Sequence, residues 1–282
     1  MLSALIAGLL CCQDPKPAPA NEPTPPPQQQ SPPAGGGDKP AAVPQRHVEA
    51  WDDQLAKAKV RDFQKVLKGK PGMAVRSQAL DDLAGGQNAQ LVKPLADFVQ
   101  SDDSVVLKKR AVELLGDQPA DKANSAILQL LDSKASDSAA VQAELIRALS
   151  RCGYEPRHWQ KIDDLFERNY DPSRVAVHEA ILDLVAAHGE RQAVPMLLRN
   201  LDEPVPRDVD GAANPPADYW KARWTSWSAW RSKVKDALFA VTGQRFSTVD
   251  EAKAWLAKNP LKAADSPANP KGKPDAKPKA GK

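Results

Sequence analysis

The sequence predicts an all-α fold: an α-solenoid of about four to five helix–turn–helix repeats, with a Trp-rich C-terminal capping segment and disordered ends. Three observations predict it. An apolar pattern of helical period recurs at a spacing of about 34 residues. Four of the seven tryptophans lie within residues 220–231 and continue into an aliphatic helical stripe. Proline-rich stretches that lack large apolar side chains occupy both ends of the chain.

The repeat unit consists of two amphipathic segments joined by a polar break. Four first segments align without gaps, and each carries apolar residues at positions i, i+4 and i+8, which is the period of one helix face. The first members of these columns are 32, 34 and 36 residues apart. A single hairpin cannot bury such a stripe, so neighbouring repeats are expected to stack into one core. The columns are Val75/Ala79/Leu83, Leu107/Ala111/Leu115, Val141/Leu145/Leu149 and Val177/Ile181/Val185.

A second amphipathic run follows each first segment. Two of these runs contain a proline, Pro94 and Pro195, which lie 19 and 18 residues after the first column of their repeats. Proline is tolerated in the first turn of a helix, so both residues are expected to mark the start of a second helix.

The first segment beginning at Ala74 carries the pattern Val-Arg-x-x-Ala-x-x-x-Leu, formed by Val75, Arg76, Ala79 and Leu83. This pattern resembles the first helix of HEAT repeats, and the two prolines match the residue that often opens the second helix of that repeat. The resemblance covers roughly residues 72–202. It implies an α-solenoid with a concave face for macromolecules, and it implies no catalytic residues. Armadillo and tetratricopeptide units are the competing solenoids.

Residues 218–242 are expected to form one uninterrupted helix, which Gly243 ends. At about 100° per residue, Trp220, Trp224 and Trp227 fall within an arc of about 60°, with Trp230 on its shoulder. The same spacing reaches Arg231, Val234, Leu238 and Val241. Thr248 to Glu251 is typical of a capping box that opens a last helix, which carries Trp255 and closes the segment 218–258. VKDALFAVTGQRF, followed by Trp255, resembles the closing segment of some bacterial exported HEAT-repeat proteins.

The tryptophan face has two interpretations. Four exposed tryptophans would form a patch of about 600–1,000 Å², whereas the largest apolar patch on a monomer is about 300–600 Å². We therefore expect the face, Trp224 included, to be buried as a lid on the last repeat. The alternative is a partner-binding or carbohydrate-binding site made by Trp220, Trp224, Trp227 and Trp230.

The two ends of the chain predict export and disorder. Residues 1–12 are an apolar run typical of a signal peptide, with a lipid anchor on a cysteine as the alternative. Residues 13–46 form a Pro-rich linker and residues 259–282 a basic Lys/Pro/Ala tail, both expected to be disordered. Such a tail favours at most weak contact with anionic surfaces, and the charge pattern does not indicate specific nucleic-acid binding. No transmembrane span is expected.

The sequence offers no motif for catalysis, a cofactor or a metal. His178 and His188 are too far apart for a zincin helix, so both are interpreted as surface residues. Asp208 to Gly211 matches only part of a calcium loop and is interpreted as a solvated turn within the loop 203–217. Cys152, at an expected helix end, is interpreted as a small, partly buried structural residue.

These observations favour a non-enzymatic, exported scaffold or adaptor in which repeats of residues 47–202 bind a protein or an envelope polymer. Two alternatives stay open. One is a carbohydrate-binding module that uses the Trp-rich segment, and the other is a lyase-like or maturase-like accessory subunit of an enzyme.

Overall fold

The computed structural model of the chain describes residues 48–167, 170–206, 211 and 214–261. These residues are almost entirely helical, with two strands of two residues each, which confirms the prediction of an all-α fold. The predicted signal peptide, the predicted linker 13–46 and the basic tail beyond residue 261 lie outside the described residues. Part of the predicted turn at Asp208 to Gly211 lies outside them as well.

The elements follow one another along the chain with short connections. The α-helices are α1 (Asp53–Lys68), α2 (Met73–Asp81), α3 (Ala89–Ser101), α4 (Val105–Leu115), α5 (Ala120–Leu131), α6 (Ala139–Gly153), α7 (Trp159–Glu167), α8 (Val175–His188), α9 (Val194–Arg199), α10 (Ala217–Thr242) and α11 (Val249–Lys258). Four 3-10 helices lie between them: η1 (Lys134–Asp137), η2 (Pro156–His158), η3 (Pro172–Arg174) and η4 (Arg191–Ala193). The strands β1 (Glu49–Ala50) and β2 (Gly86–Gln87) pair in parallel. Among the described helices, none has both the length and the apolar character that crossing a bilayer needs.

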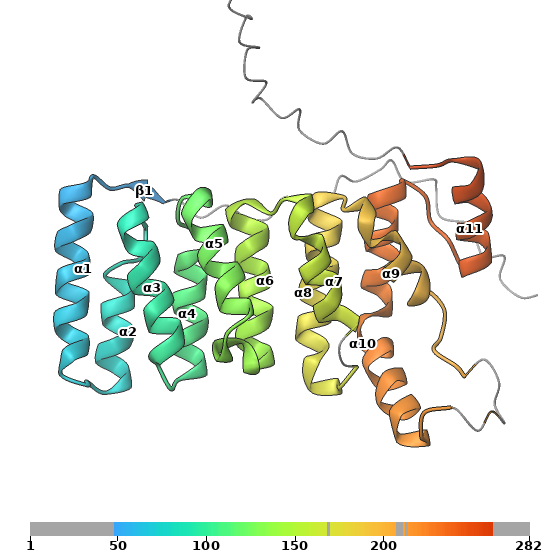
Figure 1. The fold of residues 1–282 in the computed structure, drawn as a ribbon, viewed down its shortest axis with the longest axis horizontal. Coiled ribbons are helices and arrows are strands. Elements are labelled where there is room, and N and C mark those ends of the chain that lie inside the picture. The colour runs from blue at the N-terminus through green and yellow to red at the C-terminus, as the bar shows by residue number, and fades with distance from the viewer. Residues whose placement is uncertain (1–47, 168–169, 207–210, 212–213, 262–282) are drawn as a thin grey trace, which may run out of the picture. The chain divides into compact units, whose positions relative to one another are not determined.

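Each helix packs mainly against helices that lie one or two places away from it in chain order (Figure 1). One series of contacts runs from α2 to α4, α6, α8 and α10. A second series runs from α1 to α3 and α5, and α9 packs between α10 and α11. The helices α2, α4 and α6 also meet α1, α3 and α5 of the second series, and α8 and α10 meet α7 and α9. The helices thus form two layers with the core between them.

The predicted apolar columns supply this core. Eleven of the twelve column residues are buried, among them Leu107, Val141 and Ile181. The exception is Val75, of which 50% is exposed. Because α2 begins at Met73, Val75 lies in the first turn of a helix of only nine residues, and Met73 in the same turn is also exposed. The predicted column Val75/Ala79/Leu83 is therefore wrong at Val75 and right at Ala79 and Leu83.

The helix ends test two further expectations. Pro195 is the second residue of α9, as predicted. Pro94, however, lies inside α3, which begins at Ala89. The Asn88 side chain accepts a hydrogen bond from the backbone N–H of Gln90 and so starts the helix a turn earlier than the proline does. The expectation that Pro94 opens its helix is wrong.

The last two helices end and begin at the predicted signals. Gly243 follows α10 with φ of 73°, a left-handed conformation that favours glycine. The Thr248 side chain accepts from the backbone N–H of Glu251 at the start of α11. The Glu251 carboxylate accepts from the backbone N–H of Ser247, one residue before the position that an ideal capping box uses.

Candidate functional site

The four tryptophans of α10 are divided between the core and the surface. Trp227 and Trp230 are buried, Trp220 is half-buried, and 47% of Trp224 is exposed. The buried stripe of α10 therefore passes through Trp227, Trp230 and Val234, with Trp230 at its centre rather than on its shoulder. Trp224 lies roughly 100° from the middle of that stripe. The expectation that Trp224 is buried is wrong.

Trp230 is packed among aromatic side chains of α7 and α8. Its ring centroid lies 5.5 Å from that of Phe166 and 5.7 Å from that of His178. Its indole Nε1 is buried and has no hydrogen-bond partner. The Tyr170 ring stacks on the His178 ring. The two rings are parallel, and their centroids lie 5.7 Å apart. This buried aromatic cluster thus joins α10 to α7 and α8.

His178 belongs to this core, so its interpretation as a surface residue is wrong. It is fully buried on α8, and its Nε2 lies 3.1 Å from the backbone carbonyl of Phe166. Burial lowers the pKa of the imidazole to about 4, so the ring is neutral near pH 7. The position of His178 four residues before the buried Leu182 was the available signal. His188 is exposed, as predicted, and its Nε2 lies 3.0 Å from the Ser150 hydroxyl.

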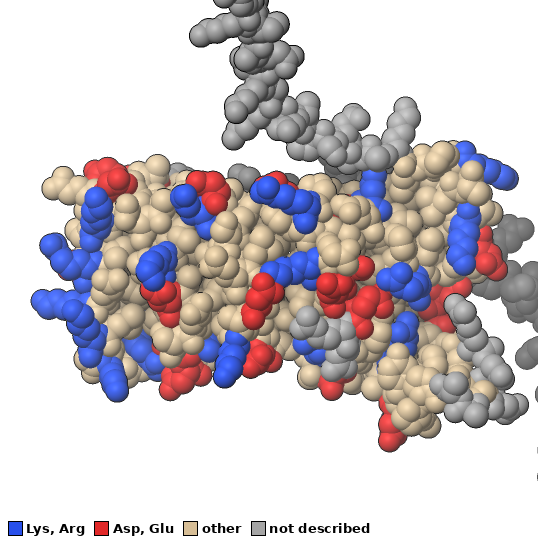
Figure 2. Space-filling model, in the orientation of Figure 1, with Lys and Arg blue, Asp and Glu red and all other residues tan. Residues whose placement is uncertain are grey.

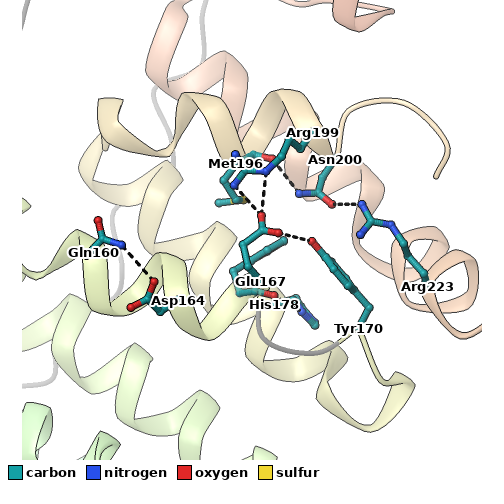
Figure 3. Close-up of polar contacts among 10 residues, drawn as sticks. Gln160, Asp164, Glu167, Tyr170, His178, Met196, Arg199, Asn200 and Arg223 are labelled. Carbon is teal, nitrogen blue, oxygen red and sulfur yellow. Dashed lines mark hydrogen bonds and ion pairs between the residues drawn. The ribbon is translucent and has the colours of Figure 1, made fainter. Parts of the chain in front are cut away.

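Polar contacts surround the same junction (Figure 3). The Glu167 carboxylate accepts from Arg199 at 2.8 Å and from the Tyr170 hydroxyl at 2.9 Å. The Arg223 guanidinium lies over the Tyr170 ring at 4.1 Å and also contacts the Asn200 side chain. Burial raises the pKa of the Tyr170 phenol to about 12, so it stays protonated and donates. These side chains come from α7, α9 and α10 and hold the helices together.

The exposed aromatic residues lie on the first turns of α10. Trp224 donates from Nε1 to the Glu203 carboxylate at 2.6 Å, which fixes the indole against the segment after α9. Tyr219 is 39% exposed and its ring lies edge-on to Trp220 at 5.3 Å. Val205 is 65% exposed. What the tryptophan segment presents to solvent is therefore a small aromatic patch rather than a four-tryptophan platform.

A groove of about 700 Å³ lies elsewhere, between the end of α5 with η1 and the segment η2–α7. None of the α10 tryptophans lines it. Its apolar lining comes from Leu128, Leu131 and Leu165. Exposed charged side chains of both signs surround these leucines: Asp132, Lys134, Asp137, Arg157 and Asp164.

Lys161, on α7, lines this groove and contacts the end of α5. Its Nζ donates to the backbone carbonyl of Leu128 at 3.0 Å and forms an ion pair with Asp132. Both partners lie at the C-terminal end of α5, where the helix dipole favours a cation. Lys161 therefore joins α7 to the C-terminal end of α5 beside the groove.

His158 also lines the groove, and it is mostly buried. Its Nδ1 accepts from the backbone N–H of Glu155 at 3.2 Å, which leaves the proton of the neutral ring on Nε2. Burial lowers the pKa of this imidazole, so the neutral form prevails at neutral pH. Sequence reasoning missed the groove, because its leucines and charges are spread over α5, η1, η2 and α7 and follow no motif.

Cys152 is buried at the end of α6, and burial raises the pKa of its thiol to about 12, which agrees with a structural role. Within the described part of the chain, no group of three His, Cys, Asp or Glu side chains is placed to hold a metal ion. No family model, curated protein or solved structure matches the chain.

Proposed function

We propose that the chain is a HEAT-like α-solenoid that acts as an exported, non-enzymatic scaffold and binds a protein partner in the groove between α5 and α7. The observation that carries the solenoid is the span of the side-chain hydrogen bonds between helices. Gln118 to Asn88 spans 30 residues, Asn124 to Gly153 spans 29, and Arg199 to Glu167 spans 32. These separations lie close to the repeat length of about 34 that the sequence predicts, as expected when each repeat contacts its neighbours.

The groove supports a protein partner more than a small molecule. Small-molecule pockets are mostly apolar and enclosed. Here three leucines lie among carboxylates and cations, which is the arrangement of an interface with an apolar centre and a polar rim. Leu131 and Leu165 are buried beneath the groove, so an extended polypeptide would place an apolar side chain on the half-buried Leu128 and its own charges against Lys134 and Asp137.

The carbohydrate-binding alternative has a narrower basis than four tryptophans. Trp227 and Trp230 are buried, so a sugar ring would stack on Trp224 with Tyr219 beside it. The enzyme-subunit alternative would need a convergent set of acidic, His and Arg side chains. Glu167, His178 and Arg199 approach that description, but their contacts join helices and they do not line the groove.

The test is site-specific photo-crosslinking of the full chain in an envelope extract. A photoreactive residue at Gln160, which is exposed and lines the groove, is compared with one at Lys122, an exposed position on α5 outside it. We expect a discrete crosslinked protein from position 160 alone. The pair Lys134→Glu and Arg157→Glu should remove it, while the control pair Lys122→Glu and Lys235→Glu should not. Equal products from both positions, or none from position 160, would refute a groove partner.

A further inference from the structure

The first helix carries a stripe of basic side chains on its outer face. Lys57, Arg61, Lys65 and Lys68 are spaced at i, i+4, i+8 and i+11, so they fall within an arc of about 80°. All four are exposed, and α1 buries only Ala56 and Phe63. The stripe is about 16 Å long at 1.5 Å per residue. In Figure 2 basic side chains gather over α1 at the left edge of the molecule.

The four cations of this stripe are unpaired within the described residues, although Asp53 and Asp62 lie on the same helix. In the described part of the chain, none of them forms an ion pair or a side-chain hydrogen bond. Several arginines on other helices are paired, as Arg110 is with Asp81 and Arg151 with Glu144. Unpaired lysines also occur in twos on α4, α10 and α11, but none of these helices carries a row of four cations on one face.

The charge of the chain is concentrated accordingly. Residues 53–70 hold six basic and two acidic residues, a net charge of +4. Residues 71–261 hold 24 basic and 27 acidic residues, a net charge of −3. The helical body beyond α1 is slightly acidic, so the positive charge that an external anion would meet is concentrated at α1.

We propose that the α1 stripe docks the protein on an anionic lipid bilayer. A row of cations on one exposed helix face suits a flat array of anionic headgroups, to which each Lys or Arg near the surface contributes. The export that residues 1–12 predict would bring the chain to a membrane, and α1 is the first described helix after them. The site is separate from the α5–α7 groove and does not depend on a protein partner.

The test is sedimentation of the full chain with vesicles of phosphatidylcholine and phosphatidylglycerol at 3:1, compared with phosphatidylcholine alone. Neutral vesicles report any contribution of the N-terminal apolar run, so the increment on anionic vesicles is the measured quantity. Each cation near an anionic surface is worth about 1 kcal/mol, or about fivefold in partitioning. We expect Lys57→Gln, Arg61→Gln, Lys65→Gln and Lys68→Gln together to lower the increment at least tenfold, and 300 mM salt to do likewise in the unaltered chain.

A matched variant controls for net charge. Lys109→Gln, Lys122→Gln, Lys235→Gln and Lys253→Gln remove four exposed cations that are in no ion pair and lie on four different helices. This variant should lose less than about threefold. Equal losses in the two variants, or binding that survives in the α1 variant and is lost when the lysines of residues 262–282 become Gln, would overturn the proposal. So would retention of the α1 variant's vesicle binding together with loss of its binding to heparin, which would indicate an anionic polymer instead.

Discussion

The indole Nε1 of Trp227 donates a 2.9 Å hydrogen bond to the backbone carbonyl of Asn200, the residue that follows α9. One residue earlier, the Ser226 hydroxyl donates to the backbone carbonyl of Tyr170 at 2.7 Å. These bonds span 27 and 56 residues, and the second is far longer than one repeat. The Trp-rich helix is therefore tied to two preceding segments at once, as a structure that closes an array of repeats would be.

Trp230 should carry most of the stability of this junction. Trp230→Ala removes a fully buried indole from contact with Phe166 and His178. The expected loss is about 3–5 kcal/mol in the free energy of unfolding, measured by urea denaturation. Trp224→Ala, its control on the same helix, should cost less than about 1 kcal/mol because much of that side chain is exposed. A larger loss from Trp224→Ala would mean that the packing described for α10 is wrong.

Trp230→Phe tests whether the buried indole Nε1 of Trp230 lacks a hydrogen-bond partner. Its indole Nε1 is buried without a partner, so replacing the indole with a benzyl ring removes a donor that makes no hydrogen bond. We expect Trp230→Phe to lose no more than about half of what Trp230→Ala loses, because the ring contact is largely kept. Equal losses in the two variants would indicate that Nε1 has a partner.

His178 should make stability depend on pH. Its pKa is about 4 in the folded chain and near 6.5 when exposed, so the unfolded chain binds the extra proton between these values. Stability should fall as pH drops from about 6.5 to 4, by about 3 kcal/mol in all from this residue. His158, whose pKa is also lowered, acts in the same direction. The measurement is the difference between the unaltered chain and His178→Gln, which should shrink across this window. A difference that stays constant with pH would contradict the assignment.

Gly86 should not tolerate a side chain. A Cβ at this position would lie 2.3 Å from the Trp51 ring, which covers the short strand β2. Gly86→Ala should therefore lower the melting temperature by several degrees, because about 1–3 kcal/mol is lost when a packed site is overfilled. Gly72→Ala is the matched control, since its Cβ would meet nothing within 4 Å. Similar melting temperatures for the two variants would show that Trp51 is not packed there.

Gln118 should be a costly buried amide. Its Nε2 donates to the backbone carbonyls of Gly86 and Leu114, both at 3.0 Å, and its Oε1 accepts from the backbone N–H of Asn88. Gln118→Ala leaves these backbone groups without that partner, at an expected cost of about 2–3 kcal/mol. The stability of both variants is measured by differential scanning calorimetry. Gln90→Ala, at an exposed position, should leave the stability nearly unchanged. A neutral Gln118→Ala would show that water replaces the amide without loss.

The all-α fold and most of the core could be predicted from the sequence, because helical periodicity reports which face of a helix is apolar. Leu107, Val141 and Ile181 lie where their columns place them. Periodicity does not show where the end of a helix extends beyond the helices that cover it. It therefore predicted Val75 in the core, although Val75 lies in the exposed first turn of α2. A single asparagine cap was likewise enough to start α3 before Pro94.

The candidate sites were harder to predict because they depend on contacts between helices that are distant in the sequence. Trp224 and Trp230 are both tryptophans on one helix, and which of them is buried is decided by the position of Phe166 and His178 on other helices. The α5–α7 groove likewise arises from the way Lys161 holds α7 to the end of α5. No local pattern in the sequence specifies these distances.

The most direct test of the capping role of α10 is hydrogen exchange of Trp230→Ala beside Trp224→Ala. In an array whose repeats contact only their neighbours, damage at one end opens that end first. We predict that Trp230→Ala loses protection in α8 and α10 while the amides of α3 and α4 stay protected, and that Trp224→Ala exchanges like the unaltered chain. Uniform loss of protection from α3 to α10, or loss only in Trp224→Ala, would contradict the account.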